Sequence, residues 1–139
     1  MPVTREDVER ILTTSKTLAV VGLSDKPDRD SHQIASYLQQ AGYRIIPVNP
    51  RIAEALGEKA HPSLRDIPER VDVVQIFRRS QDVPPIVDEA LAIGAKVVWM
   101  QSGIVHEEAA ARAEAAGVTV VMDACMRSAH RALRASGRL

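Results

Sequence analysis

Short apolar runs alternate along the chain with longer segments in which apolar residues recur every three or four positions. The apolar runs cover residues 17–22, 44–50, 71–77, 96–100 and 118–122. Runs this short, rich in valine and isoleucine and bounded by glycine or polar residues, are typical of strands buried on both faces. The pattern therefore predicts five strands separated by helices.

The longer segments carry helix signals. Thr4 and Asp7 form a capping pair ahead of a helix that ends near Thr14. A second helix is expected from a cap at Asp30 or Ser31, with Gln33 as the capping-box partner, to Gly42. Three more are expected over residues 82–94, 106–116 and 125–135.

The segment 51–70 is the least regular part of the chain. Gly57, Pro62 and Pro68 interrupt it, and we expect one helical turn at 52–56 and a minimal strand at 59–61. Just before it, Pro47 lies inside a predicted strand without a backbone N–H to donate. This places the strand 44–50 toward an edge of the sheet.

Strands that alternate with helices of about ten to thirteen residues favour parallel pairing. The predicted fold class is α/β, a doubly wound three-layer Rossmann-like fold with a mostly parallel sheet of five to six strands. A length of 139 residues is typical of one domain, which we expect to span residues 1–139.

The composition narrows the class of partner. Eighteen basic and eighteen acidic residues cancel, so nothing suggests nucleic acid or an anionic membrane as a partner. The apolar runs fall far short of the ~20 residues that span a bilayer, and the acidic N-terminal segment is unlike a signal peptide. We therefore expect a cytoplasmic protein, and a lone cysteine, Cys125, agrees with a reducing compartment.

Polar residues follow each predicted strand. In parallel sheets ligands bind outside the carboxyl ends of the strands, near the point where strand order reverses. The residues at these ends are Gly22-Leu23-Ser24, Asn49-Pro50-Arg51, Arg78-Arg79-Ser80, Gln101-Ser102-Gly103 and Asp123-Ala124-Cys125. We expect them to converge on one cleft.

The first of these turns, GLSDKPDRD, contains one glycine where a dinucleotide fingerprint has three, and it is not a P-loop. Its hydroxyl and backbone donors, with Lys26 and Arg29, stand ahead of a helix and suit a phosphate or pyrophosphate. The alternative is a solvated charged loop.

The next two strand ends add cations. Arg51 stands where a nicotinamide site usually has an acid, and it suits a phosphorylated ribose, as in NADP or coenzyme A. An arginine packed on its own loop is the alternative. The pair Arg78-Arg79 suits a phosphate equally well as it suits a neighbouring carboxylate such as Asp82.

Catalytic and metal interpretations have weaker support. Cys125 and His130 share one segment, but a lone cysteine after a buried strand is more often a core residue. The four histidines show no metal-ligand spacing. Trp99 lies within a predicted strand and is expected in the core.

In its ordered motifs the chain resembles the small stand-alone CoA-binding proteins, relatives of the N-terminal Rossmann-like domain of the succinyl-CoA synthetase alpha subunit. The motifs are VVGLSDKPDRDSHQIASYL, GYRIIPVNP, LGEKAHPSL, VDVVQIFRRSQDVPPIV, AIGAKVVWMQSGI and VVMDACMRSAH. The likeness runs from about Thr17 to Leu133. Positions 32 and 124, here His32 and Ala124, depart from the family's usual residues.

The resemblance implies a CoA cleft. The first turn would contact the phosphates, the second strand end the adenosine phosphate, the third the adenine, and the fourth the pantetheine arm. The implied cofactor-binding residues are Gly22, Leu23, Ser24, Lys26 and Arg29; Val48, Asn49, Pro50 and Arg51; Ile76, Phe77, Arg78 and Arg79; and Gln101 and Gly103. The synthetase's phosphohistidine domain has no counterpart in this chain, so ligase chemistry does not transfer.

Three hypotheses of function follow. The first is a protein that binds coenzyme A or acyl-CoA without catalysis of its own, as a monomer or a homodimer. The second is an NADP-dependent oxidoreductase that uses the same cleft, although no proton relay is evident for hydride chemistry. The third, a pure interaction module, leaves the cationic strand ends without a role.

Overall fold

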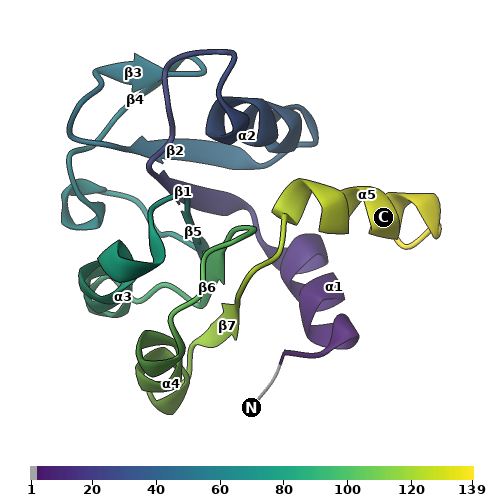
Figure 1. The fold of residues 1–139 in the computed structure, drawn as a ribbon. Helices are drawn as coiled ribbons and strands as arrows, with labels where there is room; N and C mark the ends of the chain where they lie inside the picture. The colour runs from purple at the N-terminus through teal and green to yellow at the C-terminus, as the bar shows by residue number, and fades with distance from the viewer. Residues whose placement is uncertain (1–2) are drawn as a thin grey trace.

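A five-stranded parallel sheet confirms the predicted α/β, Rossmann-like fold in the computed structural model, which describes residues 3–139 (Figure 1). The strand order is β2-β1-β5-β6-β7. The strands are β1 (Thr17–Val21), β2 (Arg44–Val48), β5 (Val73–Ile76), β6 (Val97–Met100) and β7 (Thr119–Val121). Each forms within one predicted apolar run.

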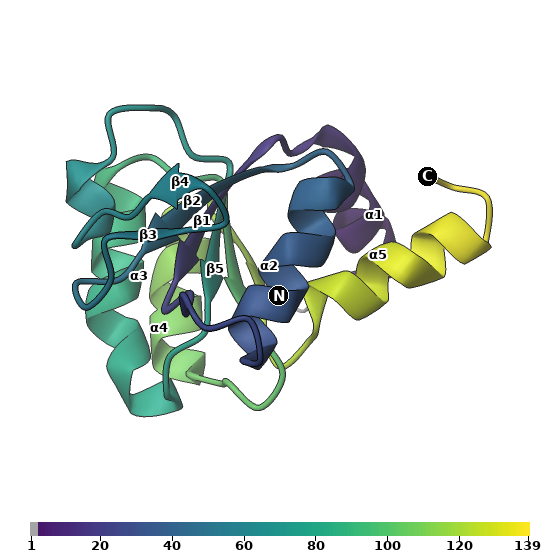
Figure 2. The ribbon, with the colours of Figure 1, turned by 90° about the horizontal axis from the view of Figure 1, so that it is seen from above.

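Helices cover both faces of this sheet. They are α1 (Arg5–Thr14), α2 (Asp30–Gln40), α3 (Val83–Ala92), α4 (Glu107–Ala115) and α5 (Met126–Ala135), with short 3-10 turns η1 (Leu64–Asp66) and η2 (Ser80–Asp82). Figure 2 shows α3 and α4 on one face and α1, α2 and α5 on the other. The result is the predicted three-layer arrangement (Figure 2). Within residues 3–139, no helix is long and apolar enough to cross a membrane.

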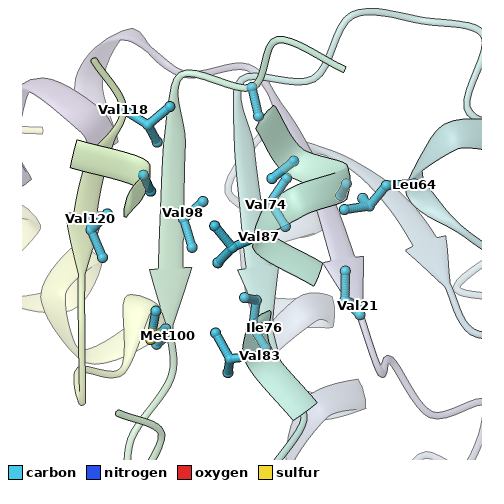
Figure 3. Packing of buried hydrophobic residues seen from close by; sticks show 14 of the residues in the cluster. Val21, Leu64, Val74, Ile76, Val83, Val87, Val98, Met100, Val118 and Val120 are labelled. Carbon is cyan, nitrogen blue, oxygen red and sulfur yellow. The ribbon is translucent and has the colours of Figure 1, made fainter. Parts of the chain in front are cut away.

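Alternate residues of each strand point to opposite faces and fill two cores. On one face Val74 and Ile76 of β5 pack with Val98 of β6 against Val83 and Val87 of α3 (Figure 3). The other core lies under α1, α2 and α5, and it contains Leu18, Val73 and Trp99. Trp99 is fully buried, as predicted, and its indole Nε1–H donates to the Ala124 carbonyl at 2.8 Å. Burial of each large apolar side chain contributes about 1.5–3 kcal/mol to folding.

The helix starts include one confirmation and one correction. At α1, Thr4 and Asp7 form the predicted capping box. At α2, Arg29 is the N-cap and makes no side-chain cap bond, so the predicted caps at Asp30 and Ser31 are wrong. Ser31 instead accepts a hydrogen bond from the loop ahead of the helix, because that loop folds back over the first turn.

The segment after β2 forms a hairpin, and the predicted helical turn at 52–56 is wrong. β3 (Glu54–Ala55) pairs antiparallel with β4 (Glu58–Lys59). Leu56 and Gly57 both have positive φ, 55° and 77°, which suits a two-residue hairpin turn and excludes a helix. The minimal strand predicted at 59–61 is partly confirmed, because β4 includes Lys59 and His61 forms a bridge with Val48.

Strand β2 is at the edge of the sheet, as Pro47 predicted. The Pro47 carbonyl accepts from His61 N–H on the outer side of the strand, so the edge is partly covered by the segment after the hairpin. From β2 the chain returns past β1 to β5, and the strand order reverses between β1 and β5. Ligand sites of doubly wound sheets lie at such a reversal.

Candidate functional site

A cavity of about 880 Å³ opens beside this reversal, at the carboxyl ends of β1, β2 and β5. Its walls come from the loop after β1, the first turn of α2 and the loops after β2 and β5. The lining residues are Gly22, Ser24, Asp25, Lys26, Asp28, Arg29, Asp30, Ser31, Asn49, Arg51, Ile52, Phe77 and Arg78. The structure thus brings together residues from three of the predicted strand ends.

Gly22 allows the loop after β1 to pass close to the end of β5. Its φ is 90°, and a Cβ on this residue would lie 2.6 Å from the Phe77 carbonyl oxygen. Its N–H donates to the Val48 carbonyl at 2.8 Å, which ties the loop to β2 as well. The single glycine of GLSDKPDRD therefore allows the ends of neighbouring strands to come into close contact.

Two serine hydroxyls order the same loop, one by a bond from the loop to α2 and one by a bond within the loop. The Ser24 N–H donates to the Ser31 hydroxyl oxygen at 3.0 Å, and the Lys26 N–H donates to the Ser24 hydroxyl oxygen at 3.1 Å. Each hydroxyl accepts in these bonds, so its own proton remains available to a ligand. The loop is therefore an ordered wall with two hydroxyl donors.

Asn49 connects the loops after β1 and β2. Its side-chain Nδ2 donates to the Leu23 carbonyl at 3.0 Å, and its Oδ1 accepts from the Arg51 N–H at 2.9 Å. Its backbone N–H donates to the His61 carbonyl. Asn49 thus lines the cavity with its amide already engaged on both sides, and it fixes where the Arg51 backbone lies.

The charged side chains of the cavity wall form no ion pairs within the described part of the chain. Lys26, Arg29, Arg51 and Arg78 all line the cavity, and within residues 3–139 none of them forms an ion pair. Three acids, Asp25, Asp28 and Asp30, also line it and are likewise unpaired there. Cations gathered from three strand ends and left without partners suit a phosphorylated ligand.

The two arginines after β5 differ in their surroundings. Arg78 is half-buried and lines this cavity and the two next to it, whereas Arg79 is exposed and pairs with Asp82 at 3.3 Å. The carboxylate alternative therefore holds for Arg79, whereas phosphate binding by Arg78 stays a prediction.

A second cavity of about 560 Å³ adjoins the first, because Asp30, Phe77 and Arg78 line both. The other lining residues are Ile34, Arg79, Gln101, Ser102, Ile104, Cys125 and Arg127. Gln101 is buried in its wall, where its Oε1 accepts from Gln75 Nε2 and from the Met126 N–H, both at 3.0 Å. The bond from the Met126 N–H holds the end of β6 against the start of α5.

The remaining predicted residues lie elsewhere. Leu23 and Ile76 are fully buried, and their side chains belong to the two cores of the sheet. Val48 and Pro50 line a smaller cavity of about 200 Å³ that also includes Arg78. Gly103 lines none of these three cavities, and its N–H donates to Asp123 Oδ1 at 2.7 Å.

Several lining residues were absent from the predicted set. In the first cavity they are Asp25, Asp28, Asp30, Ser31 and Ile52, and in the second they include Ile34, Ile104, Cys125 and Arg127. The acids belong to the same charged loop as Lys26 and Arg29, and this position could have identified them as lining residues. No feature of the sequence identified the isoleucines as lining residues, because apolar residues at these positions are expected in the core.

Cys125 and His130 occupy separate environments. Burial raises the pKa of the Cys125 thiol, but hydrogen bonds from Ser128, the Arg127 N–H and Gln101 outweigh burial and leave the pKa below its ordinary value. His130 is buried, with Nδ1 2.8 Å from the Tyr37 hydroxyl oxygen, and burial lowers its pKa. No group of three or more His, Cys, Asp or Glu side chains in the described part of the chain is arranged to hold a metal ion.

These features define a doubly wound Rossmann-like domain with a polar, cation-bearing cavity at its topological reversal. The family model described as "CoA binding domain" matches residues 16–131, and the chain belongs to this family.

Relatives extend the comparison. The chain is 49% identical to the protein YneT of Bacillus subtilis over 126 residues, which cover 91% of this chain and 93% of YneT. It is 35% identical to acetate–CoA ligase [ADP-forming] II of Archaeoglobus fulgidus over 70% of this chain, but it spans only 15% of that ligase. A solved structure from Pyrococcus horikoshii superposes with a TM-score of 0.92 at 40% identity, covering 96% of each chain.

Proposed function

We propose that this protein binds coenzyme A or an acyl-CoA in the first cavity and performs no chemistry of its own on the bound molecule. The observation that carries the proposal is the set of four unpaired cations contributed by three strand ends at the topological reversal. Membership of the CoA-binding domain family supports the same ligand.

The arrangement of donors suggests how the ligand lies. Lys26 and Arg29, with the hydroxyls of Ser24 and Ser31, would hold the pyrophosphate. Arg51, whose backbone N–H donates to Asn49, would hold the phosphate on the ribose. The half-buried ring of Phe77, beside Arg78, offers an apolar surface for the adenine.

NADP is the alternative ligand for this cavity, because NADP and coenzyme A both carry a phosphorylated ribose beside a pyrophosphate. Calorimetric titration with CoA, dephospho-CoA and NADP separates the possibilities. We expect CoA to bind most tightly, and dephospho-CoA to bind less tightly because Arg51 would have no phosphate to contact. Binding of NADP alone would contradict the proposal.

Arg51→Ala tests the assigned phosphate contact. A charge-assisted hydrogen bond contributes about 1.5–3 kcal/mol, so the variant should bind CoA roughly tenfold to a hundredfold more weakly. Its affinity for dephospho-CoA should change little, which would narrow the gap between the two ligands. The matched control is Arg5→Ala, because Arg5 is an exposed residue of α1 that lines none of the cavities. An unchanged gap in Arg51→Ala would show that another residue holds the ribose phosphate.

A further inference from the structure

The second cavity is the natural continuation of the proposed coenzyme site. It shares Asp30, Phe77 and Arg78 with the first cavity, so a ligand whose phosphates lie in the first can extend into the second. Two isoleucines, Ile34 and Ile104, and the Phe77 ring make part of its wall apolar. Its charged residues are three arginines and one aspartate.

Arg127 differs from the other arginines of this wall because one of its nitrogens is buried without a hydrogen-bond partner among residues 3–139. Its Nε is buried and has no hydrogen-bond partner, and no acid of residues 3–139 forms an ion pair with the guanidinium. By contrast, Arg79 in the same wall is neutralised by Asp82. A partly buried cation without a partner costs folding free energy, which an anionic ligand group would offset.

The phosphates of coenzyme A do not meet this need, because the proposed function places them among the four cations of the first cavity. The pantetheine arm beyond the pyrophosphate carries no charge. An anion that reaches Arg127 would therefore belong to the acyl group. Arg127 is in the first turn of α5, where the positive end of the helix dipole adds to the attraction.

We propose that the second cavity selects acyl-CoA thioesters whose acyl chain ends in a carboxylate, with Arg127 as the specificity-determining residue. This inference rests on the proposed function, because it requires the coenzyme to occupy the first cavity. A guanidinium holds a carboxylate through two parallel N–H bonds, a geometry that a terminal methyl group cannot use. The cavity therefore discriminates by the end of the acyl chain.

Calorimetric titration with matched thioesters tests the proposal. Succinyl-CoA and butyryl-CoA have acyl chains of equal length that end in a carboxylate and a methyl group, and malonyl-CoA and propionyl-CoA form a second pair. We expect at least one dicarboxylic thioester to bind roughly tenfold more tightly than its partner, as one charge-assisted pair allows. Equal affinity within both pairs would overturn the inference while leaving the proposed function intact, since free CoA is titrated alongside.

Variants of α5 locate the effect. Arg127→Met should abolish the preference and leave free CoA affinity unchanged, and Arg127→Lys should retain part of it. Arg131→Met is the matched control, because Arg131 is exposed on the same helix, lies over the Tyr37 ring at 5.0 Å and lines neither cavity. If Arg127→Met weakened CoA and every thioester equally, Arg127 would be a phosphate ligand and the inference would be wrong. If the wild-type protein bound no CoA, the proposed function itself would fail.

Discussion

The charged residues at the two ends of the parallel sheet differ in whether they have partners within the protein fold. At the amino ends of the strands, Arg44 pairs with Glu69 at 2.6 Å and with Glu58 at 3.3 Å. There also the Asp72 carboxylate accepts from the Lys16 and Thr17 N–H groups at 2.9 and 3.0 Å. At the carboxyl ends the charged residues of the first cavity have no ion-pair partner among residues 3–139.

The difference separates charges that support the fold from charges available to a ligand. A paired or hydrogen-bonded charge is satisfied within the folded chain, and its removal is felt as lost stability. An unpaired cation near a helix N-terminus opposes the helix dipole, as Lys26 and Arg29 do ahead of α2. The carboxyl end thus holds residues that cost stability and that a bound anion would satisfy.

Gly22→Ala tests how much the close approach of the cavity wall to the end of β5 matters for stability. Among the variants compared here, we expect it to lose the most free energy of unfolding. Positive φ costs a non-glycine residue about 1–2 kcal/mol, and overlap with the Phe77 carbonyl adds about 1–3 kcal/mol. We expect urea denaturation to show a loss of about 3 kcal/mol. Gly94→Ala is the control, because Gly94 has φ 74° with no atom within 4 Å of a new Cβ, and it should lose only about 1 kcal/mol. Equal losses would mean that the close approach to Phe77 carries no cost.

Asp72→Ala probes the amino end. It leaves two backbone N–H groups without their acceptor, and we expect the free energy of unfolding to fall by about 2 kcal/mol. Asp28→Ala, at the carboxyl end, removes an exposed and unpaired acid and should change stability by less than about 0.5 kcal/mol. Similar losses in the two variants would remove the distinction between the two ends.

The same carboxylate predicts a pH dependence. Burial raises the pKa of Asp72, but the N–H bonds from Lys16 and Thr17 and nearby cations outweigh burial and leave the pKa below its ordinary value. A carboxyl with a lowered folded pKa stabilises the fold above its unfolded pKa, about 4, and loses this contribution as pH falls through the folded pKa. Unfolding curves should therefore show the gap between wild type and Asp72→Ala closing below about pH 4. A gap that persists unchanged at lower pH would contradict the assignment.

Arg44→Met and Arg29→Met should give the smallest effects, with opposite signs. Arg44 is about half exposed, so its loss should cost only about 0.5–1 kcal/mol. Arg29→Met should leave stability unchanged or raise it by about 0.3 kcal/mol, because it removes a cation at the helix N-terminus. Calorimetry should show the reverse order for CoA, with weaker binding only in Arg29→Met. Loss of affinity in Arg44→Met would show that the two ends are not independent.

Local patterns in the sequence were enough to predict the layers of this protein and the three strand ends that line the first cavity. Apolar runs, helical spacing and glycine stops are local signals, and each strand lies within its run while Trp99 is buried as expected. The prediction failed at 52–56, where a hairpin replaced a helical turn. There, pairing of Glu54 with Lys59 outweighs the helix propensity of the alanine and leucine residues.

Which charged residues lack a partner could not be predicted from these local patterns. Arg78 and Arg79 are neighbours in sequence, yet one faces the cavities and the other pairs with Asp82. Arg127 was predicted only as part of a helix, whereas the fold brings it into the wall of the second cavity with residues that follow β5 and β6 and leaves its Nε buried without a partner among residues 3–139. The physical reason is that a charge is satisfied or left free by atoms distant in sequence, whose positions depend on strand order and helix packing.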